Sequence, residues 1–162
     1  MSDRKDPRTP QLSRRAVLGG LAGLATLGAG YAIWRRIPPP YEGGKLSVAQ
    51  AFDAASGGAV LLVDIRTPRE WRQTGLPQGG VPLDMRRKDF IQELTALAGG
   101  DTARPIALIC ARGVRSARLS RQLSAAGFTR IIDVPQGMLG SGAGPGWIAS
   151  GLPVVPWDGV MS

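Results

Sequence analysis

The sequence predicts an α/β fold with a mainly parallel central sheet. Leu61, Leu62 and Val63 form a continuous apolar run, which is typical of a strand buried on both faces of a parallel sheet. Short strand patterns also alternate with helical patterns over residues 46–157. The chain of 162 residues is long enough for one such domain with an appendage. We therefore expect a domain at 46–157, a Pro/Gly linker at 37–45 and a separate N-terminal segment at 1–36.

The first predicted elements of the domain are a helix and a strand. Ser47 is a suitable N-cap for a helix over residues 48–55, because its hydroxyl can accept a hydrogen bond from a free backbone N–H. The Ser-Gly-Gly sequence at 56–58 ends that helix. The apolar run then lies in a strand over residues 59–64.

Later elements continue the alternation. Residues 87–98 place apolar side chains on one helical face, and Gly99 and Gly100 end that helix. Pro105 precedes a strand over residues 106–109, and a helix over 116–126 ends at Gly127. Another strand begins at Ile131. This order places the loop after residue 109 at the carboxyl end of a strand, where open α/β sheets bind ligands.

The positive charge of the chain is concentrated in its N-terminal segment. The net charge is +8, and residues 1–41 hold 7 Lys/Arg against 2 Asp/Glu, which leaves 13 against 10 for the remainder. A nucleic-acid-binding domain would need a basic face on its folded part. We therefore expect no nucleic-acid partner, and we attribute the basic N-terminus to contact with a membrane or a translocon.

The N-terminal segment resembles a twin-arginine export signal. Arg14 and Arg15 precede an apolar stretch at 16–34, which is 34 − 16 + 1 = 19 residues long. As a helix at ~1.5 Å per residue it would be about 28 Å long, close to the ~30 Å hydrocarbon core of a bilayer. We expect an N-terminal hydrophobic helix, either a cleaved signal or a membrane anchor, with the domain in or facing the periplasm.

The single cysteine is the candidate nucleophile. Cys110 follows the apolar stretch at 106–109 and precedes Gly113 and Arg115 at the start of a helical pattern. Cationic neighbours and a helix N-terminus can lower a thiol pKa from about 8.5 to roughly 3.5–7.5, which favours the reactive thiolate. The alternative is an inert, buried cysteine that only fills space.

Three separated segments resemble the rhodanese-like sulfurtransferases. They are the Cys-x4-Arg loop at 110–115, the Asp-x-Arg turn with a following Glu-aromatic pair at 64–71, and the Gly-Met and Trp…Gly-Leu-Pro patterns at 137–153. The resemblance covers about residues 46–156. It implies a three-layer sandwich, no cofactor, no metal and a persulfide on Cys110. The active loop that it implies consists of Ala111, Arg112, Gly113, Val114, Arg115 and Ser116.

The resemblance also assigns roles around the cysteine. Arg115 completes the loop as a hydrogen-bonding cation. Arg112 either attracts an anionic donor or is a solvated surface residue, and both interpretations remain open. Asp64 and Arg66 are expected to be structural and to hold their turn against the cysteine loop.

The chain departs from the family pattern in two places. Gly75-Leu76 stands where many members carry Gly-His, and the sequence contains no histidine, so a histidine proton relay is excluded. The Gly-rich stretch at 140–146 is inserted before Trp147 and is expected to form a turn-rich surface segment.

We expect transfer of a sulfane sulfur from a small anionic, thiosulfate-like donor to a thiol or cyanide acceptor through a Cys110 persulfide. Two alternatives remain. One is an exported sulfur-carrier or binding module with little small-molecule turnover. The other is a Cys-based phosphatase or arsenate reductase, whose loops place five residues between Cys and Arg, whereas four stand between Cys110 and Arg115.

Overall fold

The computed structural model describes Tyr31 and residues 37–159. The chain divides into two units, Met1–Ile37 and Pro38–Ser162, and only the second is described below. The paired arginines and, except for Tyr31, the hydrophobic helix predicted at 16–34 lie outside the described residues. Among the residues that are described, no helix combines the length and the apolar character that a membrane crossing requires.

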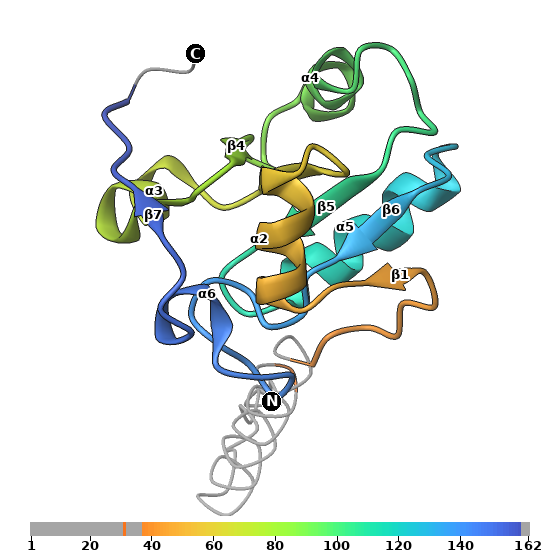
Figure 1. The fold of residues 1–162 in the computed structure, drawn as a ribbon. Coiled ribbons are helices and arrows are strands. Elements are labelled where there is room, and N and C mark those ends of the chain that lie inside the picture. The colour runs from red at the N-terminus through yellow and green to blue at the C-terminus, as the bar shows by residue number, and fades with distance from the viewer. Residues whose placement is uncertain (1–30, 32–36, 160–162) are drawn as a thin grey trace, which may run out of the picture. The chain divides into compact units, whose positions relative to one another are not determined.

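A five-stranded parallel sheet forms the centre of the domain, as predicted (Figure 1). Its strand order is β1-β6-β5-β2-β4, so β5 occupies the middle. The strands are β1 (Gly44–Lys45), β2 (Leu61–Asp64), β4 (Gly80–Pro82), β5 (Ile106–Ile109) and β6 (Ile131–Asp133). The carboxyl ends of β2, β5 and β6 therefore meet at one edge of the sheet.

Five helices and a small second sheet complete the described fold. The helices are α2 (Val48–Ser56), α3 (Pro68–Thr74), α4 (Phe90–Leu97), α5 (Val114–Ala125) and α6 (Gly146–Ala149). The second sheet pairs β3 (Leu76–Pro77) with β7 (Val154–Val155) in antiparallel orientation. Beyond β7, Trp157 packs edge-on against Trp71 of α3, with ring centroids 5.2 Å apart. Trp157 therefore lies against α3.

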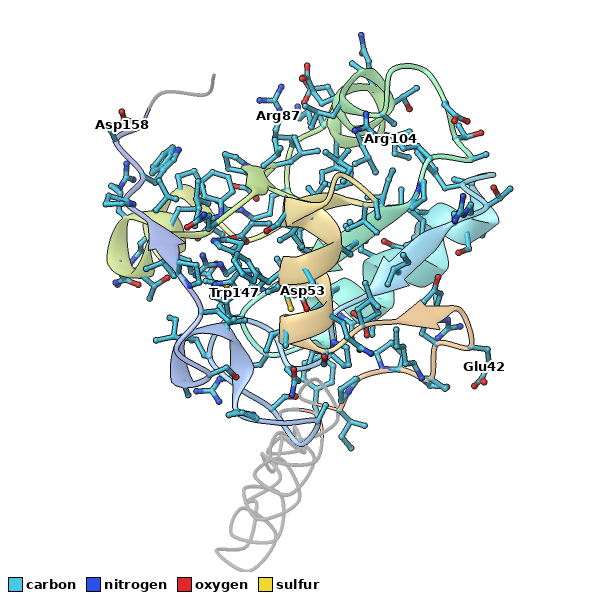
Figure 2. The ribbon with its side chains drawn as sticks, in the orientation of Figure 1. Glu42, Asp53, Arg87, Arg104, Trp147 and Asp158 are labelled. Atoms are coloured by element: carbon cyan, nitrogen blue, oxygen red, sulfur yellow. The ribbon has the colours of Figure 1, made fainter. Side chains whose placement is uncertain are left out.

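Two hydrophobic clusters, one on each face of the sheet, make the domain a three-layer sandwich. One cluster joins α4 and α5 to the sheet, and the other joins α2 and the region of α6 to the opposite face. Trp147 of α6, labelled in Figure 2, is fully buried in the second cluster. Its ring packs edge-on against Phe52 of α2, with centroids 5.8 Å apart. Helices on both faces explain why β2 and β5 are apolar runs without alternation.

Local capping sets the start of the first helix. The Ser47 hydroxyl accepts a hydrogen bond from the Gln50 N–H, and the Gln50 side chain accepts one from the Ser47 N–H.

Two other helices begin at residues that differ from the prediction. The predicted helix over 87–98 begins later, at Phe90, because Arg87 is in a turn and its N–H donates to Asp84 O. The predicted helix over 116–126 begins earlier, at Val114.

The stretch predicted as a linker at 37–45 contributes to the domain. Tyr41 is only 7% exposed, and its hydroxyl donates to Ile131 O at 2.7 Å. Gly44 and Lys45 pair with β6 as the edge strand β1. The Pro and Gly content of the stretch did not predict this packing. The buried ring of Tyr41 and the two strand residues, Gly44 and Lys45, are enough to hold the stretch on the domain.

Candidate active site

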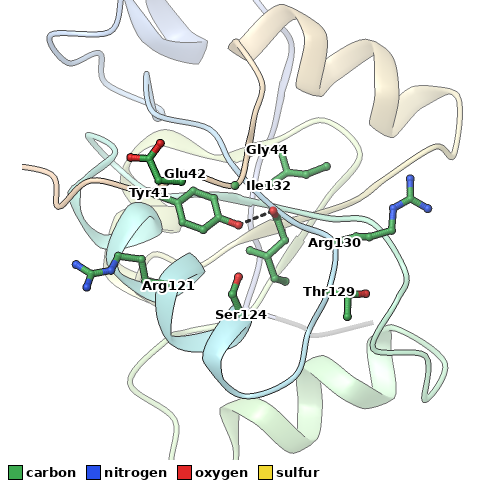
Figure 3. Close-up of a pocket in the computed structure, with 10 residues that line it drawn as sticks. Tyr41, Glu42, Gly44, Arg121, Ser124, Thr129, Arg130 and Ile132 are labelled. Atoms are coloured by element: carbon green, nitrogen blue, oxygen red, sulfur yellow. Dashed lines mark hydrogen bonds between the residues drawn. The ribbon is translucent and has the colours of Figure 1, made fainter.

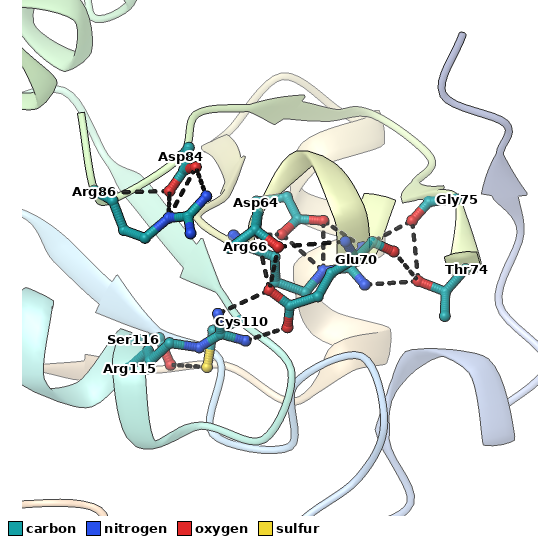
Figure 4. Close-up of polar contacts among 11 residues, drawn as sticks. Asp64, Arg66, Glu70, Thr74, Gly75, Asp84, Arg86, Cys110, Arg115 and Ser116 are labelled. Atoms are coloured by element: carbon teal, nitrogen blue, oxygen red, sulfur yellow. Dashed lines mark hydrogen bonds and ion pairs between the residues drawn. The ribbon is translucent and has the colours of Figure 1, made fainter. Parts of the chain in front are cut away.

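Cys110 directly follows the central strand β5, at the carboxyl edge of the sheet. Its side chain belongs to the cluster on the α4 and α5 face, and the residue is 1% exposed. The Sγ atom lies 3.6 Å from Ser116 Oγ and donates to it, and the Ser116 hydroxyl donates to Gly113 O at 3.1 Å. The cysteine is therefore buried but has a polar neighbour at its sulfur (Figure 4).

The loop after the cysteine presents unpaired backbone donors. From Ala111 to Ser116, no backbone N–H donates to an acceptor within the described part of the chain. Such groups are costly to leave without a partner, and a run of them at a helix start is a binding site for an anion. The loop can therefore hold a negatively charged sulfur or the oxygens of an anionic donor.

Two glycines fit the cysteine loop against the loop that follows β6. Gly113 has φ +79°, and a Cβ there would lie 2.2 Å from Pro135 O. Gly137 has φ +64°, and a Cβ there would lie 2.6 Å from Ala111 O. The backbones approach this closely only because neither residue carries a side chain. The packing fixes the path of the loop around the sulfur.

Hydrogen bonds also join the cysteine loop to the loop that follows β6. The N–H of Met138 donates to Cys110 O, and the N–H of Leu139 donates to Ala111 O, both at 2.9 Å. The Gly-rich insertion at 140–146 forms a tight turn in which Ser141 and Gly144 bond to each other. The Ser141 hydroxyl donates to Pro135 O at 2.7 Å. The insertion therefore supports the loop that lies against Gly113.

Arg115 is held by a bidentate ion pair with Glu70 of α3. Arg115 Nη1 donates to Glu70 Oε2 at 2.9 Å, and Nη2 donates to Oε1 at 2.5 Å (Figure 4). The two side chains are 32% and 27% exposed. Glu70 raises the pKa of Arg115, and Cys110 adds to this rise, so the guanidinium also lies within electrostatic reach of the cysteine.

Glu70 also completes the cap of its own helix. Its Oε2 accepts hydrogen bonds from the backbone N–H and the hydroxyl of Thr67. Partial burial acts to raise the pKa of Glu70, but the bonds from Arg115 and Thr67 outweigh it and lower the pKa from 4.5 to about 2. The carboxylate therefore remains charged at any ordinary pH.

Asp64 and Arg66 form a buried pair at the end of β2. Arg66 Nε and Nη2 donate to the Asp64 carboxylate, and the two side chains are 1% and 0% exposed. The remaining bonds of the guanidinium go to Thr74 Oγ1 and Gly75 O, both at or beyond the end of α3. Within the described residues none goes to the cysteine loop, so the pair braces α3 rather than the loop that we expected it to hold.

Glu70 is the residue of the candidate site whose contact with Arg115 sequence reasoning missed. It was noted only as part of a Glu-aromatic pair, whereas it links α3 to the cysteine loop. The Thr67-x-x-Glu70 spacing is a capping-box signal that placed the carboxylate at the helix start. Its pairing with Arg115 has no local signal, because the two residues are 45 positions apart.

Three other arginines lie in or near the cysteine loop, and none of their side chains forms a hydrogen bond or an ion pair with the described residues of that loop. Arg112 is exposed and has no hydrogen bond or ion pair with the described residues, so it is available to a passing anion. Arg118 and Arg121 are exposed on α5. Arg121 lines a shallow pocket of about 560 Å³ between the Tyr41 region and β6 (Figure 3). That pocket contains no residue of the cysteine loop.

Comparison with known sequences identifies one family. The sequence pattern of the family described as the rhodanese-like domain matches residues 47–140. An uncharacterised protein of Rickettsia conorii is 26% identical over 115 residues, and the match covers 64% of this chain and 90% of the relative. The match spans Asp64, Glu70 and the whole cysteine loop.

Two solved structures illustrate the shared fold. The polysulfide-sulfur transferase homodimer of Wolinella succinogenes has a TM-score of 0.56 and 23% identity, over 74% of this chain and 83% of that one. A protein of Rhodopseudomonas palustris described as a possible tyrosine phosphatase has a TM-score of 0.51 and 22% identity, over 93% of this chain and 100% of that one. At these identities the likeness shows a common fold.

We expect Gly113→Ala to damage the site more than Gly99→Ala. Both glycines have positive φ, so each change costs about 1–2 kcal/mol of backbone strain, but only at Gly113 would the new Cβ clash with backbone. Gly113→Ala should therefore lower the free energy of unfolding further and slow Cys110 alkylation. Denaturant unfolding and iodoacetamide kinetics measure both effects, and equal losses in the two variants would contradict the clash.

We expect Arg66→Met to lower the free energy of unfolding by about 3 kcal/mol or more, because it leaves Asp64 buried without its partner. Arg86→Met is the matched control. It breaks a similar Arg-Asp pair, with Asp84, but that guanidinium is 67% exposed and its loss should change little. Urea titrations compare the two, and similar midpoints would show that burial of the Asp64 pair is not what stabilises this turn.

Proposed function

The chain belongs to the rhodanese-like domain family, and from this membership and the geometry of its loop we propose that it is a sulfurtransferase. The proposed reaction moves a sulfane sulfur from a small anionic donor of the thiosulfate type to a thiol or cyanide acceptor. Cys110 carries the sulfur between the two as a persulfide. The observation that carries this proposal is the run of unpaired backbone N–H groups that follows the cysteine.

The first half-reaction needs a thiolate and an anion-binding loop. The Cys110 thiolate attacks the outer sulfur of thiosulfate and forms a new S–S bond. The S–S bond of the donor breaks, and sulfite leaves with its electron pair. One negative charge remains on the outer sulfur of the persulfide, so the same backbone N–H groups that stabilise the thiolate also suit the product.

The second half-reaction returns the enzyme to its starting state. An acceptor thiolate or cyanide attacks the outer sulfur, the persulfide bond breaks, and the electron pair returns to Cys110 Sγ. The chain has no second cysteine, so the acceptor must come from outside. Arg115 lies within electrostatic reach of Cys110, and its ion pair with Glu70 keeps the guanidinium in place in both steps.

Burial of Cys110 limits the reagents that reach it. The residue is 1% exposed, so direct attack favours small donors and acceptors or requires side chains at the loop to move.

A phosphatase or arsenate reductase is less well supported, because those loops place five residues between Cys and Arg to surround a tetrahedral oxyanion. This chain has four.

We expect wild-type protein incubated with thiosulfate to gain ~32 Da on Cys110, the mass of one sulfur atom, and to release thiocyanate on addition of cyanide. Cys110→Ser should do neither, because the persulfide cannot form. Intact-mass spectrometry and a thiocyanate assay measure the two steps, with an aryl phosphate as the competing substrate. Hydrolysis of the phosphate without a sulfur adduct would overturn the proposal, whereas an adduct with negligible thiocyanate would favour the sulfur-carrier alternative.

We propose in addition that residues 1–36 direct the domain to the periplasm, as a cleaved signal or as an anchor. The support is the sequence alone, namely Arg14 and Arg15 ahead of the apolar stretch at 16–34. We expect protein recovered from cell fractions to be periplasmic or membrane-bound. Intact-mass and N-terminal analysis distinguish the two fates, and recovery of the whole chain from the cytoplasm would contradict export.

A further inference from the structure

Three ion pairs lie at the carboxyl edge of the sheet, just beyond the ends of β2, β4 and β5 (Figure 4). In each of them a guanidinium donates two or more hydrogen bonds to a single carboxylate. The pairs are Arg66 with Asp64, Arg86 with Asp84, and Arg115 with Glu70. The positive charge of each of these arginines is therefore balanced within its own pair.

The Arg115 guanidinium is the member of this set that belongs to the cysteine loop. Its Nη1 and Nη2 atoms donate to the two oxygens of Glu70, at 2.9 Å and 2.5 Å. A guanidinium offers these donors as a planar fork, which also matches two oxygens of an oxyanion. Glu70 therefore uses the part of Arg115 that an oxyanion such as thiosulfate would otherwise bind.

The full charges at the loop sum to zero when the cysteine is a thiolate. Arg112 and Arg115 are the two cations of the loop, and Arg112 has no hydrogen bond or ion pair with the described residues. Glu70 and the Cys110 thiolate supply two negative charges. The Glu70 charge is permanent, because hydrogen bonds from Arg115 and Thr67 lower the pKa of this carboxyl to about 2. Beyond this balance, the loop offers only the partial charges of its backbone N–H groups to an incoming anion.

We propose that Glu70 sets the charge of the sulfur donor, and that the loop selects donors with one negative charge over dianionic thiosulfate. Glu70 is then a specificity-determining residue that acts through Arg115, by cancelling a charge that would attract a dianion. The preferred donor class is a singly charged sulfane-sulfur compound, such as an organic thiosulfonate. Thiosulfate still reacts, but the Glu70 charge slows it.

Methanethiosulfonate is the matched probe, because a methyl group replaces one charged oxygen of thiosulfate. The Cys110 thiolate attacks the sulfane sulfur of either ion and forms a new S–S bond. The S–S bond of the donor breaks, and methanesulfinate or sulfite leaves with the electron pair. The two donors also differ in intrinsic reactivity, but this difference is the same for every variant. A change in the ratio of their rates therefore measures the selection by charge.

The test measures this ratio in wild type, Glu70→Gln, Arg115→Gln and the double variant, at low ionic strength. Glu70→Gln keeps an oxygen that can accept from Arg115 and Thr67, but it removes the negative charge. It should raise the rate with thiosulfate relative to methanethiosulfonate about threefold, as expected for one unit charge removed near a partly solvated site. Arg115→Gln should lower the same ratio by a similar factor.

The double variant separates charge from structure. It lacks the ion pair but has the same net charge as wild type, so its ratio should return to the wild-type value. If Glu70 served only to hold α3 and the loop together, the double variant would not recover. An unchanged ratio in Glu70→Gln, or a double variant that stays at the value of either single variant, would overturn the proposal.

Asp84→Asn is the matched control. It also removes a carboxylate from a bidentate pair at this edge, but that carboxylate binds the side chain of Arg86 and no residue of the cysteine loop among those described. It should change the ratio clearly less than Glu70→Gln does. Equal changes in the two variants would show that any carboxylate at this edge has the effect, and would overturn the specific role of Glu70.

This role of Glu70 rests on the proposed sulfur transfer, but the effect of its charge is measurable without a sulfur donor. Iodoacetate and iodoacetamide both alkylate a thiolate and differ by one negative charge. The ratio of their rates cancels the fraction of Cys110 that is ionised, and it should follow the same order in the four proteins. That order without any sulfur adduct would refute sulfur transfer and leave the selection by charge standing. A sulfur adduct with equal ratios in all four proteins would refute the selection by charge alone.

Discussion

The ion pair between Glu70 and Arg115 connects the two halves of the candidate site. It joins the start of α3, which follows β2, to the start of α5, which follows β5. The same carboxylate also caps α3 through Thr67, so a shift of either helix would break contacts at both. Arg115 consequently has a fixed orientation within electrostatic reach of Cys110, although its side chain is about one-third exposed. A partly exposed ion pair contributes little to stability, but here its bidentate geometry determines where the charge of the Arg115 guanidinium lies.

The parallel sheet supplies the rest of the arrangement. Because β2, β5 and β6 run in the same direction, the turn at Asp64, the cysteine loop and the loop at Pro135 all leave the same edge. The cysteine loop lies between the other two. Glycines at 113 and 137 allow the backbone contact on the β6 side, while the Asp64-Arg66 pair keeps α3 in place on the β2 side. The burial of both faces of the sheet leaves this edge as the place where polar groups can gather.

Sequence reasoning predicted much of this fold because the relevant signals are local. The continuous apolar runs predicted β2 and β5, and the Ser47 cap predicted α2 within one residue. The short strands β1, β3 and β7 escaped prediction, since two residues carry no periodic pattern and their pairing is set by distant segments. The Cys110 loop was likewise visible as a contiguous motif. The partnership of Glu70 with Arg115, and the direction of the Arg66 bonds toward Thr74 and Gly75, depend on tertiary packing and could not be derived from spacing.

The packing of β7 against β3 has a consequence for how the protein is made. Gly75, at the end of α3, has a conformation and a contact with Val155 O that leave no room for a Cβ, and Trp157 covers Trp71. The helix that carries Glu70 is thus supported by residues synthesised some eighty positions later. During translation the cysteine loop emerges well before this support does. The nascent chain therefore presents Cys110 first and completes the support of α3 only when residues 154–157 have left the ribosome.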